Sequence, residues 1–274
     1  MSICVTVIIA AYEKPWHLER VLHGYDVQTD RNFEIVVAED GMSQKVADVV
    51  ERFSRSSNVD IRHIYQQDEG FRKSVILNKA LAIASGEYII FTDDDCVPRE
   101  NLVATHIKYM KQGQYIVGAY NRIPDLTTKK IEIPHVREQK IFSMLWLLIN
   151  GYRPYRGFVR IIAPQWLATL LDLRGKISLG RFPGGHSSCF KQDALAIGGF
   201  NENMSYGLED REFGTRLCNF GIYGRRIKNS TYMIHLAHER PYQSVEKMKE
   251  NEKILAETVE TGRVRSAHLE EKSQ

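Results

Sequence analysis

Tyr88-Ile89-Ile90-Phe91-Thr92-Asp93-Asp94-Asp95 decides the fold, because an apolar run typical of a buried strand ends there in three consecutive carboxylates. In open α/β sheets, ligands bind at the carboxyl ends of the strands. Three neighbouring acids repel one another, and a hard divalent cation that also holds phosphate oxygens would relieve that repulsion. A solvated turn at the end of a strand is the alternative interpretation of the same triplet.

Strand-like and helix-like segments alternate through the first hundred residues. Apolar runs at 5–11, 33–38, 61–65 and 87–92 predict strands, and the spacing at 16–25, 46–53 and 75–84 predicts helices. This alternation predicts an α/β protein whose central sheet is mostly parallel, with right-handed crossovers and a Rossmann-like first half. The loops that follow the strands, at 11–14, 39–41, 66–73 and 93–96, are expected to converge on one ligand.

Composition limits the classes of protein that the chain can represent. Its 274 residues are 43% hydrophobic, enough for a sizeable core, and 37 basic against 34 acidic side chains give no reason to expect a nucleic-acid partner. The cysteines have no C-x-x-C spacing, and the start shows no charged leader, so a cytoplasmic, reducing compartment is expected. The four cysteines are Cys4, Cys96, Cys189 and Cys218.

An apolar run at 141–149 is followed by Arg153, Arg156 and Arg160. The run is too short to cross a bilayer. It predicts either a helix buried against the core or a partner, which is the favoured interpretation, or a peripheral contact of 141–160 with the inner face of an anionic membrane. The segment 121–183 around it has no clear period and is interpreted as a variable region that selects the acceptor.

A second acidic pair, Glu209-Asp210, precedes a predicted helix at 211–219. Carboxylates are stabilised at a helix N-terminus, so a simple helix start is one interpretation. The other is catalytic, because a site that holds a metal and a phosphate needs a separate base to take a proton from the incoming nucleophile.

Other candidates concern the metal and the phosphates. His235 and His238 follow a strand-like run, and imidazole beside carboxylate suits Mn²⁺ better than Mg²⁺, although a histidine on an apolar strand is more often a core residue. Arg72 and Lys73 are placed to hold a diphosphate, or are exposed charges at a helix start. No Walker loop and no G-x-G-x-x-G motif follows the first strand, which argues against P-loop and ordinary dinucleotide binding.

Taken together, these motifs resemble the GT-A glycosyltransferases of the family 2 type over nearly the whole chain. Residues 7–12 resemble the opening strand of that family, 38–41 its nucleoside-binding loop, and 91–95 its D-x-D motif. Residues 184–187, 198–200, 206–210, 216–217 and 221 are similar to the C-terminal segment shared by β-1,4-galactosyltransferases and chondroitin-polymerase-like bacterial enzymes. Glu39 and Tyr206 depart from the family pattern, which has Asp and Trp at these positions, and His186 stands where a small apolar residue is common.

The resemblance implies a nucleotide-sugar donor, Mn²⁺ or Mg²⁺ as cofactor, and inversion at the anomeric carbon. It implies Asp210 as the general base, helped by Glu209. The implied metal ligands are Asp93, Asp95, His238 and, with less weight, His235. The implied donor contacts are Ala10, Tyr12, Asp40, Arg72, Asn78, Asp93 and Asp94. The implied acceptor contacts are Gly184, Gly185, Tyr206 and Glu209.

The expected division is a nucleotide-sugar-binding half at 1–120, an acceptor-binding and catalytic half at 121–240, and a helical extension at 241–274. The expected function is transfer of a hexose or N-acetylhexosamine, from UDP-Gal, UDP-GalNAc or UDP-GlcNAc, to a glycan or lipid-linked acceptor in bacterial surface polysaccharide synthesis. A nucleotidyltransferase is disfavoured because residues 11–15 are not its Gly-rich loop. A non-catalytic sugar-binding module is disfavoured because binding needs no base. The oligomeric state stays open.

Overall fold

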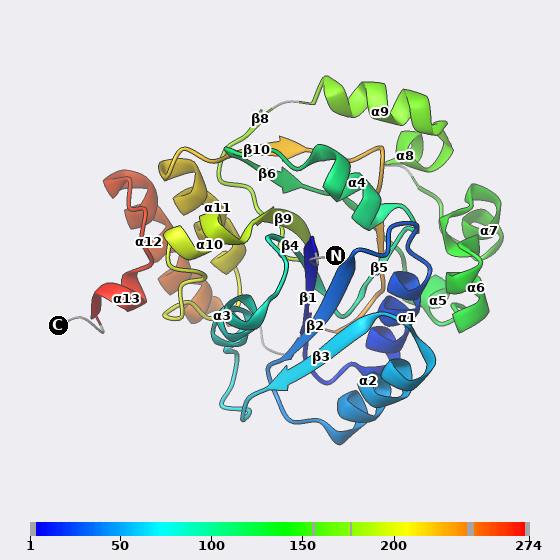
Figure 1. Cartoon of the computed structure of the whole chain (residues 1–274), viewed down its shortest axis with the longest axis horizontal. Coiled ribbons are helices and arrows are strands. Elements are labelled where there is room, and N and C mark those ends of the chain that lie inside the picture. The colour runs from blue at the N-terminus through cyan, green and yellow to red at the C-terminus, as the bar shows by residue number, and fades with distance from the viewer. Residues whose placement is uncertain (1–3, 155–156, 176, 240–243, 272–274) are drawn as a thin grey trace.

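The computed structural model describes residues 4–154, 157–175, 177–239 and 244–271, and its centre is an eight-stranded sheet (Figure 1). The strand order is β3-β2-β1-β4-β9-β6-β10-β8. All pairings among β1 to β4 are parallel, whereas β9 is antiparallel to both of its neighbours and β8 is antiparallel to β10, so the predicted mostly parallel sheet is confirmed. The strands are β1 (Val5–Ala11), β2 (Phe33–Glu39), β3 (Asp60–Tyr65), β4 (Tyr88–Asp93), β6 (Gln114–Val117), β8 (Ile177–Ser178), β9 (His186–Phe190) and β10 (Tyr223–Arg226).

Three helices connect the first four strands, as the alternation predicts. They are α1 (Pro15–Asp26), α2 (Gln44–Ser56) and α3 (Lys73–Ile83). The helix expected at 46–53 extends further at both ends. Its terminal residues, among them Gln44 and Ser56, are polar and carry no apolar period, so hydrophobic spacing marks only the buried middle of the helix.

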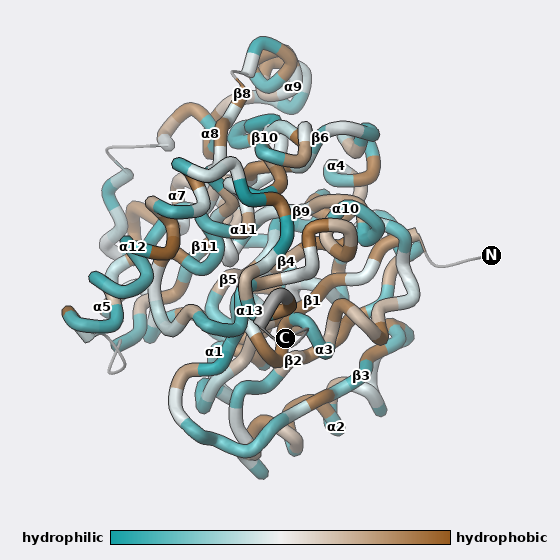
Figure 2. The backbone as a smooth tube through the Cα atoms, turned by 90° about the vertical axis from the view of Figure 1, so that its left-hand side faces the viewer, coloured by the Kyte–Doolittle hydropathy of each residue, from teal (hydrophilic) through white to brown (hydrophobic). Residues whose placement is uncertain are grey.

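The sheet divides the core into two layers. Side chains of successive strand residues point to opposite faces, so Val7 and Ile9 of β1 pack on one side with α1 and α2, while Ile8 and Ala10 pack on the other with α3. Both faces are covered, and β1 at the centre is therefore mostly apolar, as its largely brown tube in Figure 2 shows.

A smaller sheet of three strands lies beside the carboxyl end of β4. It has the order β5-β11-β7, with β11 antiparallel to β5 and parallel to β7. The strands are β5 (Cys96–Pro98), β7 (Tyr120–Arg122) and β11 (Met233–His235). The register pairs His235 with Cys96, which brings the chain beyond residue 230 next to the acidic triplet.

The remaining helices surround the second half of the chain. Within the described ranges, none of the helices is long and apolar enough to cross a membrane. These helices are α4 (Leu102–Tyr109), α5 (Asp125–Thr128), α6 (Ile133–Arg137), the 3₁₀ helix η1 (Lys140–Phe142), α7 (Met144–Ile149), α8 (Phe158–Ile162), α9 (Gln165–Leu173), α10 (Lys191–Ala196), α11 (Glu209–Asn219), α12 (Val245–Thr261) and α13 (Ala267–Glu271).

The apolar run at 141–149 is not one buried helix. It divides at Ser143, whose extended backbone separates η1 from α7. Ile141 and Leu147 are fully buried, whereas Leu145 and Ile149 are exposed. A short helix cannot turn all its residues toward the core, so the run supplies both a core contact and a surface. Of the segment 141–160, residues 155 and 156 lie outside the described residues, and Arg156 with them.

A buried ion pair holds α11 in place. Arg216 is fully buried and donates to the Glu212 carboxylate one turn earlier, at 2.7 Å. Its other nitrogens donate to the carbonyl oxygens of Ile197 and Gly199, at 2.6 and 2.7 Å. Removing one partner of such a pair leaves an uncompensated buried charge, so this network holds the acidic start of α11 against the loop after α10.

Candidate active site

The edge of the sheet that carries the carboxyl ends of β1, β2 and β4 collects polar groups from distant parts of the chain. Parallel pairing sets Ala10 beside Asp93 and Ala11 beside Glu39. Because β9 runs antiparallel to β4, it begins at this edge, and its first residue, His186, pairs with Thr92. The loop that contains Gly184 and Gly185 therefore meets the acidic triplet.

A cleft of about 360 Å³ opens at this edge. The predicted convergence of the triplet, the Glu-Asp pair and the histidines is observed, since all of them line this cleft. The predicted site residues that line it are Ala10, Tyr12, Asp40, Asp93, Asp94, Asp95, Gly184, Gly185, Tyr206, Glu209, Asp210, His235 and His238. Arg72 and Asn78 are not among the lining residues.

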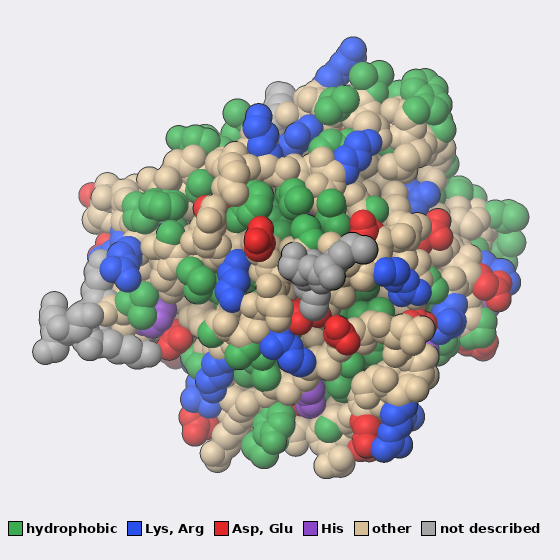
Figure 3. Space-filling view, viewed as in Figure 1, with side chains coloured by type: hydrophobic (Ala, Val, Ile, Leu, Met, Phe, Trp, Pro, Cys, Tyr) green, Lys and Arg blue, Asp and Glu red, His purple; other side chains and the backbone are tan. Residues whose placement is uncertain are grey.

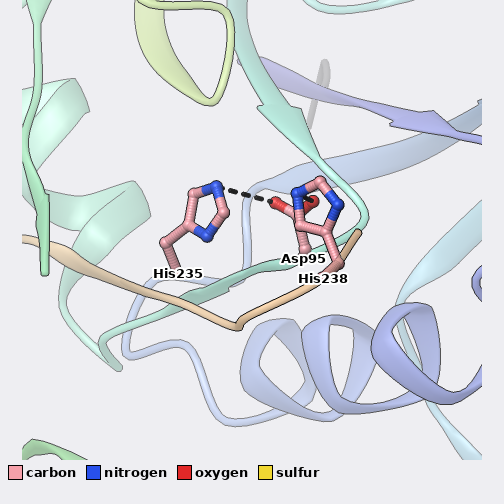
Figure 4. A group of neighbouring side chains, drawn as sticks. All are labelled: Asp95, His235 and His238. Atoms are coloured by element: carbon pink, nitrogen blue, oxygen red, sulfur yellow. Dashed lines mark ion pairs between the residues drawn. The ribbon is translucent and has the colours of Figure 1, made fainter. Parts of the chain in front are cut away.

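Asp95, His235 and His238 form a group that can hold a metal ion (Figure 4). The Asp95 carboxylate lies between the two imidazoles, 3.0 Å from Nε2 of His238 and 3.7 Å from Nε2 of His235. One potential ligand atom from each residue lies within 4.8 Å of the others. Burial alone would raise the pKa of Asp95, but its contacts with His238 and Lys14 hold that pKa well below the usual range. An ionised carboxylate with two imidazoles suits Mn²⁺.

Lys14 is a cleft residue that the site prediction missed. Its ammonium lies 2.7 Å from both an Asp94 oxygen and an Asp95 oxygen, and it neutralises part of the triplet. Burial, followed by the charge of Asp95, raises the pKa of Asp94 to about 6 against the opposing effect of Lys14. Its position in the sequence could have indicated this role, because Lys14 is the last residue of the loop 11–14, and that loop was expected to face the ligand.

Lys73 has the same relation to the first acid of the triplet. It is the first residue of α3, and its ammonium forms a short contact with Asp93. Burial opposes the charged form, yet the nearby charges of Asp93, Glu209 and Asp210 raise the pKa of Lys73 above its ordinary value. Lys73 therefore stays a cation between the triplet and the Glu-Asp pair.

Glu209 and Asp210 begin α11, where Glu209 is buried and Asp210 is half-buried. Leu208 before them has a positive φ of 68°, a strained conformation that turns the helix start into the cleft. The Asp210 carboxylate accepts a hydrogen bond of 2.9 Å from the Gly184 amide. Burial and then the charge of Asp210 raise the pKa of Glu209 to about 7, and burial also raises the pKa of Asp210. Raised carboxyl pKa values are typical of general bases.

Gly185 permits the close approach of the Gly-Gly loop to the triplet. A Cβ at this position would lie 3.0 Å from an Asp93 oxygen and 3.1 Å from the Cys96 sulfur. Any larger residue would push the loop away from β4. Close packing at the floor of the cleft therefore explains why residue 185 is a glycine.

Asp40 and Tyr12 lie on the opposite side of the cleft, where β1 and β2 end. Both Asp40 oxygens accept hydrogen bonds, one from the Gln66 amide at 2.7 Å and one from the Arg72 backbone N–H at 2.6 Å. The Arg72 guanidinium turns away, toward the Gln67 carbonyl and the Glu69 carboxylate. Arg72 therefore supports Asp40 through its backbone, and its side chain does not reach the cleft.

Aromatic and cationic side chains complete the rim. Tyr206 meets Phe71 edge to face, with ring centroids 5.4 Å apart. Tyr120 and Arg122 enter from β7. The prediction missed Phe71, although it lies in the loop 66–73 that was expected to face the ligand. It also missed Tyr120 and Arg122, because the place of β7 depends on its pairing with β11.

The side chain of Asn78 has a structural role, because it forms hydrogen bonds within the protein. Its amide oxygen accepts from the Phe200 N–H at 2.7 Å, and its amide nitrogen donates to the Phe200 carbonyl and to Glu202, at 2.9 and 3.0 Å. These contacts join α3 to the loop after α10. They leave the expected donor contact of Asn78 without support from geometry.

We expect Asn78→Ala to lower the free energy of unfolding by about 1–3 kcal/mol, because it leaves buried backbone groups of Phe200 without partners. Donor affinity should stay within twofold of the parent, which separates a structural role from a donor contact. Chemical denaturation and calorimetric titration measure the two quantities. Gln44→Ala on the exposed start of α2 is the control and should change stability by less than about 0.5 kcal/mol. A large loss of donor affinity at unchanged stability would restore the original prediction.

Two family models cover most of the chain. The model of glycosyl transferase family 2 matches residues 6–165, and a model described as the N-terminal domain of galactosyltransferase matches residues 167–239. The first match contains the triplet and the second contains the Glu-Asp pair and both histidines. Both matched regions therefore contribute to the cleft, and the group of Asp95, His235 and His238 combines residues from the two.

Curated relatives are distant and mostly longer. The chain is 22% identical to chondroitin synthase of Escherichia coli over 74% of its own length and 30% of that protein. It is 24% identical to the uncharacterized glycosyltransferase YfnE of Bacillus subtilis, over 96% of this chain and 72% of that protein. It is 26% identical to validoxylamine A glucosyltransferase of Streptomyces hygroscopicus, over 88% and 57%. The chain thus spans about a third of the chondroitin synthase.

Solved structures share the fold at low identity. The mannosyltransferase PcManGT of Pyrobaculum calidifontis, in complex with GDP-Man and Mn²⁺, superposes with a TM-score of 0.60 at 17% identity, covering 87% of this chain and 58% of that one. GalNAc-T7 with UDP, GalNAc and Mn²⁺ gives a TM-score of 0.63 at 15% identity, covering 94% and 48%. S. aureus TarS in complex with UDP-GlcNAc gives 0.58 at 15%, covering 92% and 65%.

Proposed function

The chain belongs to glycosyl transferase family 2 and is a transferase with the GT-A fold, and from this premise we propose that it transfers a sugar from a nucleotide donor with inversion at the anomeric carbon. The observation that carries the proposal is the shared cleft. A group able to hold a metal, Asp95 with His235 and His238, lines the same hollow as the carboxylate of Asp210. Transfer needs positive charge for the leaving diphosphate and a base for the acceptor, and the cleft offers both.

The donor would lie across the ends of β1, β2 and β4. Asp40 would contact the base or ribose, and Ala10 and Tyr12 would contact the nucleoside through the first loop. Asp93 and Asp94 would lie beside ribose and diphosphate. Lys14 and Lys73 line the cleft and would contact the phosphates, whereas the side chains of Arg72 and Asn78 do not line it.

This group of potential ligands fits Mn²⁺ because it combines an ionised carboxylate with two imidazoles, which bind a metal ion in their neutral form. His235, with its pKa lowered by burial, would bind as the neutral ring. Asp93 and Asp95 would share the ion with His238. When bound, the cation supplies positive charge that stabilises the departing diphosphate.

On the other side of the cleft, Asp210 would take the proton from the acceptor hydroxyl. The hydroxyl oxygen then bonds to the anomeric carbon while the bond from that carbon to the diphosphate oxygen breaks, and the diphosphate leaves with the bonding electrons. The proton remains on Asp210, whose other contact, the Gly184 amide, keeps the carboxylate oriented. Glu209, Gly184, Gly185 and the Tyr206 ring would hold the acceptor sugar.

The proposed donors are UDP-Gal, UDP-GalNAc and UDP-GlcNAc, and the proposed acceptor is a glycan or lipid-linked saccharide of a bacterial surface polysaccharide. Similarity to a chondroitin synthase and to structures with bound UDP supports this choice. Residues 1–120 would hold the donor, 121–240 the acceptor and the catalytic pair, and 241–274 would form the helical extension.

A donor screen tests this function. Purified protein with Mn²⁺ is incubated with each nucleotide sugar, and release of the nucleoside diphosphate and thermal shift are recorded. UDP-hexoses should raise the melting temperature and be hydrolysed slowly. Release of pyrophosphate in place of a nucleoside diphosphate would indicate a nucleotidyltransferase. Donor binding without any turnover, with acceptors present, would indicate a non-catalytic sugar-binding module.

The pH dependence of transfer tests the acidic pair. Because burial raises the pKa of Asp210, this base becomes protonated as pH falls, and kcat/KM should decline on the acidic side. Glu209, whose pKa is raised to about 7, titrates within the range measured. Glu209→Gln removes one negative charge beside Asp210 and should move this decline to lower pH, although acceptor affinity also falls. Initial rates between about pH 5 and about pH 9 measure the shift. An unchanged profile would contradict electrostatic coupling of the pair.

A further inference from the structure

The helices α7, α8 and α9 present apolar side chains to solvent. They follow one another along the upper right rim of the molecule, away from the core of the large sheet (Figure 1). The exposed fractions reach 67% for Leu145, 71% for Ile149 and 69% for Trp166. An exposed patch of this kind marks an interaction surface. Its other members are Leu148, Phe158, Val159, Ile162, Leu170, Leu171 and Leu173.

The segment that carries this patch contains several basic residues and no exposed acidic residue. Residues 143–181 contain a single acidic residue, Asp172. Asp172 is buried, and its two oxygens accept hydrogen bonds from the backbone N–H groups of Lys228, Asn229 and Ser230. The Asp172 charge is therefore stabilised by these backbone donors inside the protein and does not face solvent. Among the described residues of the same segment, the basic ones are Arg153, Arg160, Arg174 and Arg181.

A basic hollow of about 600 Å³ lies beside the patch, between α8, the end of α9 and the chain after β10. Arg160, Arg174, Arg226 and Lys228 line it. In the described part of the chain, none of these four side chains forms an ion pair, and the Nε atoms of Arg160 and Arg226 are buried without a hydrogen-bond acceptor. Orphaned guanidinium donors of this kind favour an anion with several oxygens, such as a phosphate.

We propose that α7, α8 and α9 with this basic hollow dock on an anionic phospholipid bilayer. The apolar side chains enter the interface between headgroups and acyl chains, and the cations bind lipid phosphates. In Figure 3, apolar and basic side chains share the upper edge of the molecule, over α8, α9 and β10. A second copy of the same chain is disfavoured as the occupant, because a symmetric contact would set cations against cations.

The docked face adjoins the cleft. Arg160 donates to the carbonyl oxygen of Tyr120, at 3.3 Å, and Tyr120 lines the cleft. A protein held on a bilayer by this face would therefore keep the β7 side of the cleft near lipid-borne molecules. The docking surface does not depend on the proposed transfer reaction, and it can be tested without donor or metal.

Co-sedimentation with vesicles tests the proposal. The parent chain should bind vesicles that contain phosphatidylglycerol, bind phosphatidylcholine vesicles at least about tenfold more weakly, and lose affinity as salt is raised. The double variant Ile162→Glu/Trp166→Glu should lower binding at least about tenfold. Leu145→Glu on α7 is an independent test of the same face. Arg174→Gln should weaken binding about fivefold, the factor expected for one cation at an anionic surface.

Val259→Glu on α12 and Lys45→Glu on α2 are matched controls, because both residues are exposed and lie outside the patch. Each control should bind vesicles like the parent. Thermal melting and hydrolysis of a nucleotide sugar, which should be unchanged, show that the patch variants are folded. Absence of vesicle binding by the parent, or equal binding by the double variant, would overturn the proposal. So would a dimer that the double variant dissociates, since that result assigns the face to a second copy.

Discussion

Asp210→Asn should lower kcat by about 100- to 10,000-fold while the dissociation constant of the donor changes less than about twofold. The amide oxygen of Asn can still accept the hydrogen bond from Gly184, so the start of α11 keeps its place, but the amide cannot take a proton. Donor binding should survive because the proposed donor contacts lie across the cleft, on β1, β2 and β4. Rapid-quench kinetics and calorimetric titration with donor and Mn²⁺ measure the two quantities.

Arg211→Gln is the control for this variant, because it changes the adjacent, exposed residue of the same helix. It should keep the rate of the parent. If Asp210→Asn retained most of its rate, the proton would go elsewhere, and Glu209, also buried in the cleft, would become the candidate base. A matching loss of donor affinity would instead indicate that the substitution disturbs the cleft.

Asp95→Asn should weaken Mn²⁺ binding by about 100-fold or more and abolish transfer in metal-limited assays. The substitution removes the negative charge that lies between His235 and His238. It also leaves the Lys14 ammonium, now paired with Asp94 alone, beside a neutral amide and two imidazoles, an arrangement that disfavours a further cation. Electron paramagnetic resonance of free Mn²⁺ reports binding directly, without reference to activity.

Asp60→Asn at the exposed start of β3 removes the same charge far from the cleft and should bind Mn²⁺ like the parent. Chelation of the parent should reproduce the loss of transfer, and added Mn²⁺ should restore it. Undiminished Mn²⁺ binding by Asp95→Asn would remove this residue from the ligand set. Binding would then have to rest on the histidines or on Asp93 and Cys96, which form the second potential ligand group together with Asp95.

The local pattern of apolar and polar residues predicted the secondary structure, which depends mainly on residues close together in the sequence. The first four strands, the three helices between them and the position of the acids after β4 follow from apolar periodicity, which reports burial within one segment. The start of α11 was predicted two residues late, because the acids of its first turn carry no apolar period. The apolar run at 141–149 was interpreted as one element, since periodicity does not show how much core is available to cover it.

The order of the motifs along the chain indicated which residues belong to the cleft, but it did not indicate which of them contact one another. Asp95 and the two histidines meet because β11 pairs with β5, and Asp210 reaches the cleft because the Gly-Gly loop leads into an antiparallel β9. Asn78 has the residue type of a donor contact, but tertiary packing placed it against Phe200.

The sequence by itself thus determined the α/β class, the family, and the acidic and imidazole groups available for chemistry, because these depend on residue types and short-range spacing. Only the tertiary structure decided that Lys14 and Lys73 neutralise the triplet, that the Arg72 side chain turns away, and that a basic hollow lies beside an exposed apolar rim. The physical reason is that strand register and helix packing set charge pairing and burial between separate elements, across 20 positions for Lys73 and Asp93 and 81 for Lys14 and Asp95, which no local pattern records.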